Sequence, residues 1–201
     1  MIVLVRHGRT EANALGLLLG RLDPPLDPEG TRQAGCLGGA LSGLDVARVV
    51  TSPLQRCRAT AEAVAEVLTD AEGKPVPTVV DERWIEIDYG AFDGMPVADV
   101  APETWAHWRH DVTWAPEGGE SMAQLGARIR PACEALADEA SERDVVVVTH
   151  VSPIKAAVAW SLGVGDLVGS RMWVTPASIH RIGFGPAGPA LRSFNEVGHL
   201  G

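Results

Sequence analysis

The sequence alternates short apolar runs with stretches of helical periodicity, and this alternation constrains the fold more than any other feature. The runs Met1–Val5, Val46–Val50, Val76–Val80 and Val145–Val148 each have the length of a buried strand. Between them apolar residues recur at helical spacing, as they do from Ala34 to Leu41. Strands that alternate with helices predict an α/β fold, here a three-layer α/β/α sandwich with a mostly parallel central sheet.

Serine residues mark the expected starts of three helices. Ser52 and Ser152 each precede a proline, a pattern typical of a capping residue followed by the first helical position. Ser121 can cap a third helix. This interpretation places Arg56 in the first turn of a helix, just past the end of the second predicted strand.

The 201 residues are 46% hydrophobic, which is enough for one globular domain with a sizeable core. We therefore expect one domain over residues 1–201. Residues 95–117 hold Trp105, Trp108 and Trp114 among charges without strand periodicity, and they predict a helical, lid-like excursion. The tryptophans either pack this lid, line a substrate pocket or form an oligomer interface, and we favour packing.

Charge and cysteine usage exclude several classes of function. A formal net charge of -9 argues against general binding to nucleic acid or to an anionic membrane. The first apolar run is too short for a signal peptide, and no run is long enough to span a membrane. Cys36, Cys57 and Cys133 are far apart, which favours buried thiols over a disulfide framework or a zinc site. We expect a cytoplasmic protein.

Arginine and histidine residues follow three of the predicted strands. Arg6 and His7 follow the first, Arg56 the second and His150 the last, and Glu86 lies in a glycine-containing stretch between them. Ligands of parallel sheets bind at the carboxyl ends of the strands, so these side chains are expected to meet. A dianionic phosphomonoester repels anionic nucleophiles and needs cationic donors around its oxygens. A neutral imidazole beside arginines therefore suits phosphoryl transfer.

An ordered series of motifs over most of the chain resembles the histidine phosphatase superfamily, which includes cofactor-dependent phosphoglycerate mutases and many small phosphatases. The motifs are Arg6 to Asn13, Gly20 to Asp23, Leu26 to Gly30, Gln33 with Ala34, Ser52 to Arg56 with Thr60 and Ala61, Glu86 with Gly90 and Gly94, Gly118 to Ser121, and Val148 to His150. The resemblance implies a phosphoglycerate mutase-like fold and phosphoryl transfer without a metal or another cofactor.

The same resemblance implies a role for each residue at the strand ends. His7 is the nucleophile that carries the phosphoryl group, and Glu86 gives the leaving group its proton. Arg6, Arg56 and His150 then bind the phosphoryl oxygens. A positioned carboxylic acid accelerates such a reaction by about 10² to 10⁴.

Further residues are expected to contact the substrate. They are Gly8, Asn13, Gly20, Arg21 and Val151. Val151 stands where family members commonly have glycine, and its bulk leaves open whether its backbone N–H reaches phosphate. Arg9 stands where the family often has Glu or Gln, and it either adds positive charge near the distal end of the substrate or points to solvent.

The predicted function is hydrolysis of a small phosphorylated metabolite. A phosphoglycerate mutase is the alternative enzyme, but the segment Asp88–Gly94 lacks the basic, extended insert of the mutases. The run His150–Lys155 resembles actinobacterial acid phosphatase domains, and α-ribazole phosphatases are also similar. A catalytically inactive binding protein is the third interpretation, although all five residues of the expected site are present. His107 and His110 are interpreted as surface residues rather than metal ligands, and a homodimer is left open.

Overall fold

The computed structural model describes residues 1–70 and 73–201. Its strands are β1 (Ile2–Arg6), β2 (Val46–Thr51), β3 (Thr78–Val80), β4 (Asp144–Thr149), β5 (Ile179–Gly185) and β6 (Gly188–Glu196). Its α-helices are α1 (Glu11–Ala14), α2 (Pro28–Leu41), α3 (Gln55–Ala65), α4 (Pro102–His110), α5 (Met122–Glu142) and α6 (Val151–Ser161). Short 3₁₀ helices lie at Glu82–Trp84, Gly90–Phe92, Val97–Asp99, Asp166–Arg171 and Gly198–Leu200.

One six-stranded sheet has the strand order β3-β2-β4-β1-β5-β6. The pairs β3 with β2, β2 with β4 and β4 with β1 are parallel, which confirms the mostly parallel sheet. The last two strands continue the sheet in antiparallel order. The sequence pattern does not predict these two strands, because glycines and polar residues interrupt their apolar runs.

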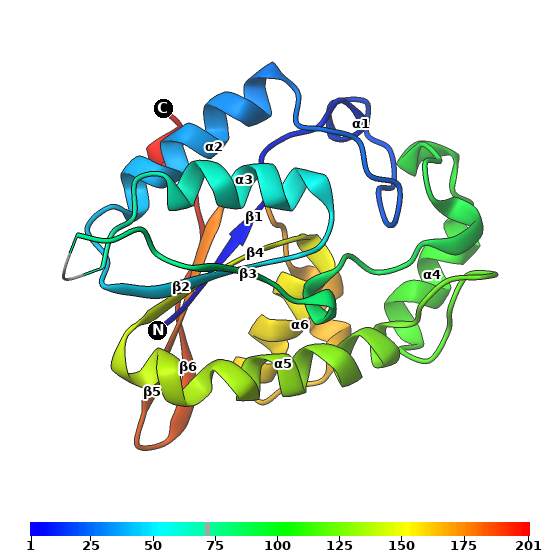
Figure 1. The fold of residues 1–201 in the computed structure, drawn as a ribbon. Coiled ribbons are helices and arrows are strands. Elements are labelled where there is room, and N and C mark those ends of the chain that lie inside the picture. The colour runs from blue at the N-terminus through cyan, green and yellow to red at the C-terminus, as the bar shows by residue number, and fades with distance from the viewer. Residues whose placement is uncertain (71–72) are drawn as a thin grey trace.

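Helices cover both faces of the sheet, which confirms the three-layer sandwich (Figure 1). The helices α2 and α3 pack on one face, where Leu37 and Val64 join one hydrophobic core. The helices α5 and α6 cover the other face around Ile129 and Ile154. Both cores share the central strands, because successive strand residues point to opposite faces. A strand covered on both faces is buried along its whole length, as β1 is, and β1 is apolar up to its last residue, Arg6.

Two of the expected helix starts are wrong. The helix after β2 begins at Gln55, and Ser52 lies outside it without capping it. The helix after β4 begins at Val151, with His150 in the extended conformation before it, so Ser152 and Pro153 lie inside the first turn. Proline is tolerated there because the first N–H groups of a helix have no acceptor within the helix. The predicted strand Val76–Val80 is shorter and begins at Thr78.

Within residues 95–117 the structure has the helix α4 and the 3₁₀ helix Val97–Asp99. The helix α4 carries Trp105 and Trp108, whose rings stack with centroids 5.6 Å apart. Trp114 meets Trp108 edge to face at 5.2 Å. Trp108 is buried, so the aromatic residues pack against one another within the excursion. Whether this segment acts as a lid stays a prediction.

The helix α5 is the longest α-helix of the described chain, and its first turn is fixed by side chains. The Ser121 hydroxyl accepts the N–H of Gln124, and the Gln124 side chain accepts the N–H of Ser121. This reciprocal capping box confirms the predicted helix start. No helix within residues 1–70 and 73–201 has both the length and the apolar character that a membrane crossing needs.

Ser121→Ala should lower the free energy of unfolding by about 1 kcal/mol, because it leaves a first-turn N–H of α5 without its acceptor. Urea unfolding with an unchanged m-value measures this loss. Ser141→Ala is the matched control, since Ser141 is exposed near the end of the same helix and bonds only to the Asp138 carbonyl. Equal stability of the two variants would contradict a capping role for Ser121.

Candidate active site

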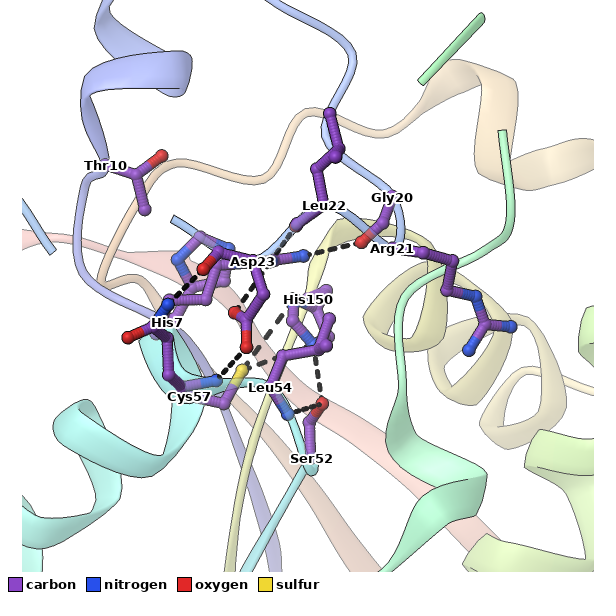
Figure 2. Close-up of polar contacts among 12 residues, drawn as sticks. His7, Thr10, Gly20, Arg21, Leu22, Asp23, Ser52, Leu54, Cys57 and His150 are labelled. Carbon is purple, nitrogen blue, oxygen red and sulfur yellow. Dashed lines mark hydrogen bonds and ion pairs between the residues drawn. The ribbon is translucent and has the colours of Figure 1, made fainter. Parts of the chain in front are cut away.

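Three strand ends bring the expected catalytic residues to one end of the sheet. Arg6 at the end of β1 pairs with Thr149 at the end of β4 in the parallel ladder. His7 and His150 therefore follow neighbouring strands, and their ring centroids lie 5.1 Å apart (Figure 2). Arg56 comes from the first turn of α3, which follows β2 on the other side of β4.

His7 is buried, and one of its ring nitrogens already has a partner. Its Nδ1 lies 2.7 Å from the Gly8 carbonyl oxygen, which can only accept, so Nδ1 carries the proton. The lone pair is then on Nε2, where imidazole can attack. Burial lowers the pKa of His7 well below its ordinary value, and the charges of Arg56 and Arg6 lower it further. The ring is therefore a neutral nucleophile near pH 7.

Arg56 is fully buried and is held mainly by backbone carbonyls. Its Nη2 donates to the Gly20 oxygen at 2.8 Å and its Nη1 to the Leu22 oxygen at 2.7 Å. The partly exposed Asp23 carboxylate lies 3.3 Å from Nη1. Within the described residues Nε of Arg56 has no hydrogen-bond partner. This arrangement orients the guanidinium and leaves its Nε–H for a ligand.

Arg6 is a second buried guanidinium in the same site. Its Nη1 donates to the Val174 oxygen at 2.6 Å, and its Nε finds no acceptor in residues 1–70 and 73–201. Burial lowers the pKa of Arg6 to about 10, and the charge of Glu86 opposes that shift. Arg6 is therefore charged at neutral pH. Buried donors without acceptors beside a neutral histidine favour an anionic ligand.

The Glu86 side chain is buried beside the first turn of α6. Its Oε1 accepts the N–H of Ile87 at 2.8 Å and the N–H of Ser152 at 3.1 Å. Burial raises the pKa of Glu86 above its ordinary value, while these hydrogen bonds and the charge of Arg56 act in the opposite direction. A carboxyl group with a raised pKa can hold the proton that a leaving group needs.

The ring of His150 is fixed by two residues that the sequence interpretation did not assign to the site. Its Nε2 lies 2.7 Å from the Ser52 hydroxyl and 3.3 Å from the Cys57 sulfur, while its Nδ1 lies 3.7 Å from that sulfur (Figure 2). The buried Ser52, expected to cap α3, instead orients His150. Burial, followed by the charge of Arg56, lowers the pKa of His150.

Two expected substrate contacts use their backbone N–H groups within the protein. Gly8 donates to the Thr60 hydroxyl at 3.1 Å, and Gly20 donates to the Asp93 carboxylate at 2.8 Å. Gly8 also permits the close approach of α2, because an added Cβ would lie 2.4 Å from the Gly30 carbonyl oxygen. Substrate binding by Gly8 and Gly20 stays a prediction. If the substrate binds these two N–H groups, each of them must first release its present acceptor within the protein.

The other expected contacts lie around the site. The Asn13 side-chain oxygen accepts the N–H of Thr10 at 3.1 Å, as part of the cap of α1. The Arg21 side chain lies 3.6 and 3.7 Å from two carboxylates and points away from His7 in Figure 2. Val151 is the first residue of α6, so its N–H has no acceptor within the helix. Their substrate contacts stay predictions.

Asp93 is a further residue that the sequence interpretation missed. Its carboxylate accepts the N–H groups of Gly20 and Arg21, each at 2.8 Å, and that of Leu22 at 2.9 Å. The carbonyls of this loop hold Arg56, so Asp93 acts on the guanidinium through the backbone. An acidic residue directly before Gly94 in an otherwise unassigned loop was the available signal.

The histidines of α4 make no metal site in the part of the chain that the structure describes. No group of three or more His, Cys, Asp or Glu side chains suitable for a metal occurs there. His107 stacks on Trp114 with ring centroids 5.8 Å apart, and His110 is exposed at the end of the helix. The side chains of both histidines are exposed at the protein surface.

Known proteins are similar to this chain over nearly its whole length. The sequence model of the histidine phosphatase superfamily (branch 1) matches residues 2–197. The chain is 34% identical over 204 residues to a bifunctional protein of Mycobacterium tuberculosis, which covers 99% of this chain and 54% of that protein. It is 36% identical over 178 residues to phosphoserine phosphatase 1 of Hydrogenobacter thermophilus, covering 86% of this chain and 79% of that protein. Probable phosphoglycerate mutases also match.

A solved structure shares the fold. Mycobacterial glucosyl-3-phosphoglycerate phosphatase, in complex with VO3, superposes with a TM-score of 0.86 at 28% identity, covering 98% of this chain and 99% of that one. The chain spans about half the length of its mycobacterial curated relatives, 54% in each case. Sequence and fold agree along the chain, and they confirm the resemblance: the chain belongs to the histidine phosphatase superfamily, branch 1.

Proposed function

We propose that the protein is a metal-independent phosphatase that hydrolyses a small phosphomonoester through a phosphohistidine on His7. The observation that carries the proposal is a neutral, buried His7 beside two buried arginines, each with an Nε that has no acceptor among the described residues. The phosphatases among the similar proteins support the same reaction class.

The reaction has two displacements at phosphorus. His7 Nε2 attacks, the bond to the ester oxygen breaks, and Glu86 protonates that oxygen as the alcohol leaves. Water then attacks the phosphohistidine, Glu86 accepts its proton, and His7 is released with inorganic phosphate. Both steps use one carboxyl group, whose raised pKa allows it to give and regain a proton.

The arginines supply the charge that a metal ion supplies in other phosphatases. Nε of Arg6 and Nε of Arg56 donate to phosphoryl oxygens, and both guanidiniums keep their present carbonyl partners. His150 adds a third donor when its weak contact with the Cys57 sulfur, 3.7 Å from Nδ1, is exchanged for a phosphoryl oxygen.

Phosphoglycerate mutase activity is the second candidate, because probable mutases are among the similar proteins. The short segment between Glu86 and α4 favours hydrolysis, since it contains only two 3₁₀ helices and a short connection. A single domain over residues 1–201 is supported by the two cores that share one sheet. The cytoplasmic location and the homodimer stay predictions.

His7→Ala should abolish phosphatase turnover in the presence of a chelator, because it removes the group that attacks phosphorus and leaves only groups that bind the phosphoryl oxygens. Wild type incubated with labelled substrate should retain acid-labile, base-stable phosphate on His7. His110→Ala, on the exposed end of α4, is the control and should keep both properties. A labelled adduct of equal size in His7→Ala would rule out the covalent route through His7.

Glu86→Gln should slow single-turnover cleavage of an alkyl phosphate by roughly 10² or more, because the alkoxide needs a proton to leave. Nitrophenyl phosphate should lose much less in the same step, since nitrophenolate departs without protonation. Rapid-quench measurement of the first turnover isolates this step from later hydrolysis. Equal losses on both esters would mean that Glu86 only positions the phosphoryl group.

For alkyl esters, the rate of that first turnover should fall at alkaline pH. Glu86 donates only when protonated, so the rate drops as pH rises through its raised pKa. The acid limb should lie well below pH 6.5, because His7 stays neutral down to its lowered pKa. Rapid-quench rates from acid to alkaline pH test both limbs. An alkaline limb of the same size in Glu86→Gln would show that another group controls it.

A further inference from the structure

A cavity of about 210 Å³ lies beside the proposed proton donor, and the chemistry at phosphorus does not use it. Val151 and Ser152 line it, and the Ser152 N–H donates to Glu86. If Glu86 protonates the leaving oxygen, as the proposed function has it, the rest of the leaving group lies in this cavity. The volume is below the roughly 300–1,000 Å³ of pockets for drug-sized ligands, so it suits a small alcohol.

The wall opposite α6 is aromatic. Trp105, Trp108 and Tyr89 line the cavity, with Trp105 stacked on Trp108 and Tyr89 edge to face against Trp108 at 5.5 Å. Such walls contact carbon atoms well and offer few hydrogen bonds. Cationic side chains line the cavity from two sides: Arg109 of α4, which is exposed, and a residue on the α6 side.

Lys155 provides a charge on that side. It lies three residues after Ser152 on α6, lines the cavity, and is half-buried. Its stem packs against Gly169, where an added Cβ would lie 3.4 Å from Lys155 Cβ. Within residues 1–70 and 73–201 its ammonium has no ion pair and no hydrogen bond among those identified, although most arginines near the site are paired. Burial lowers the pKa of Lys155, and the charge of Glu86 opposes this shift.

We propose that Lys155 binds an anionic group on the leaving alcohol, so that the enzyme prefers phosphomonoesters whose alcohol carries a second negative charge. The ammonium reaches the group in a partly desolvated cavity, where a charge-assisted hydrogen bond is stronger than in water. A carboxylate and a second phosphate share this chemistry, and the two are distinguished by experiment.

The test compares kcat/KM for pairs of substrates that differ in one anionic group. The first pair is 3-phosphoglycerate and glycerol 3-phosphate, and the second is the bisphosphate and the monophosphate of propane-1,3-diol. In at least one pair, wild type should have the higher kcat/KM for the substrate with the second anionic group. The pair that shows this preference identifies whether that group is a carboxylate or a phosphate. Lys155→Met should reduce that preference roughly tenfold or more, mainly through KM, as expected for one hydrogen bond to a charged group. Lys155→Arg should retain it.

Lys74→Met is the matched control, because Lys74 is the other lysine of the chain and is exposed. It should leave the preference as in wild type. If Lys155→Met does not fold, Lys155→Gln gives the same comparison, and thermal unfolding reports which variant is intact. No preference in wild type, or equal losses on both members of each pair, overturns the proposal. Absence of nitrophenyl phosphate turnover in wild type would instead contradict the proposed function.

Discussion

The site depends on keeping two guanidinium groups charged inside the protein. Burying a charge is costly unless it is hydrogen-bonded, and a buried carboxylate partner would cancel the charge that a phosphate needs. The structure solves this for Arg56 with the carbonyl oxygens of Gly20 and Leu22. The loop that carries these oxygens is held in turn by the Asp93 carboxylate, which accepts three of its N–H groups. The segment 20–22 is therefore part of the arginine site even though its N–H groups face away from it.

The same burial prepares both reacting groups. Removal from water disfavours the charged form of any side chain, so it lowers the pKa of His7 and raises the pKa of Glu86. The arginines reinforce the first shift, whereas Arg56 opposes the second. One environment thus yields a neutral nucleophile and a carboxyl group that can hold a proton, so burial prepares two different roles within one site.

The sequence alone was enough to predict the site residues that directly follow the ends of strands. His7 and His150 meet because their strands are apolar, parallel and adjacent. The pattern predicts the first two properties, whereas the adjacency of β1 and β4 comes from the strand order of the structure. The role of Ser52 was not predictable, since the same serine before proline also fits a helix cap, and only the packing of β2 against β4 brings it to His150. Asp93 acts through contacts with the distant segment 20–22, for which the acidic residue before Gly94 was only a weak signal. The strands β5 and β6 lack a continuous apolar run, so their sequence carried too little signal.

The most direct test of the account is a crystal structure of the protein with orthovanadate, which adopts the geometry of phosphorus during transfer. The account predicts vanadium bonded to His7 Nε2, with Nε of Arg6 and Nε of Arg56 each donating to a vanadate oxygen while the bond from His7 Nδ1 to Gly8 persists. Glu86 should lie within hydrogen-bond distance of the oxygen opposite His7. Vanadate bound away from His7, or bound with both arginine Nε atoms still lacking an oxygen partner, would contradict it.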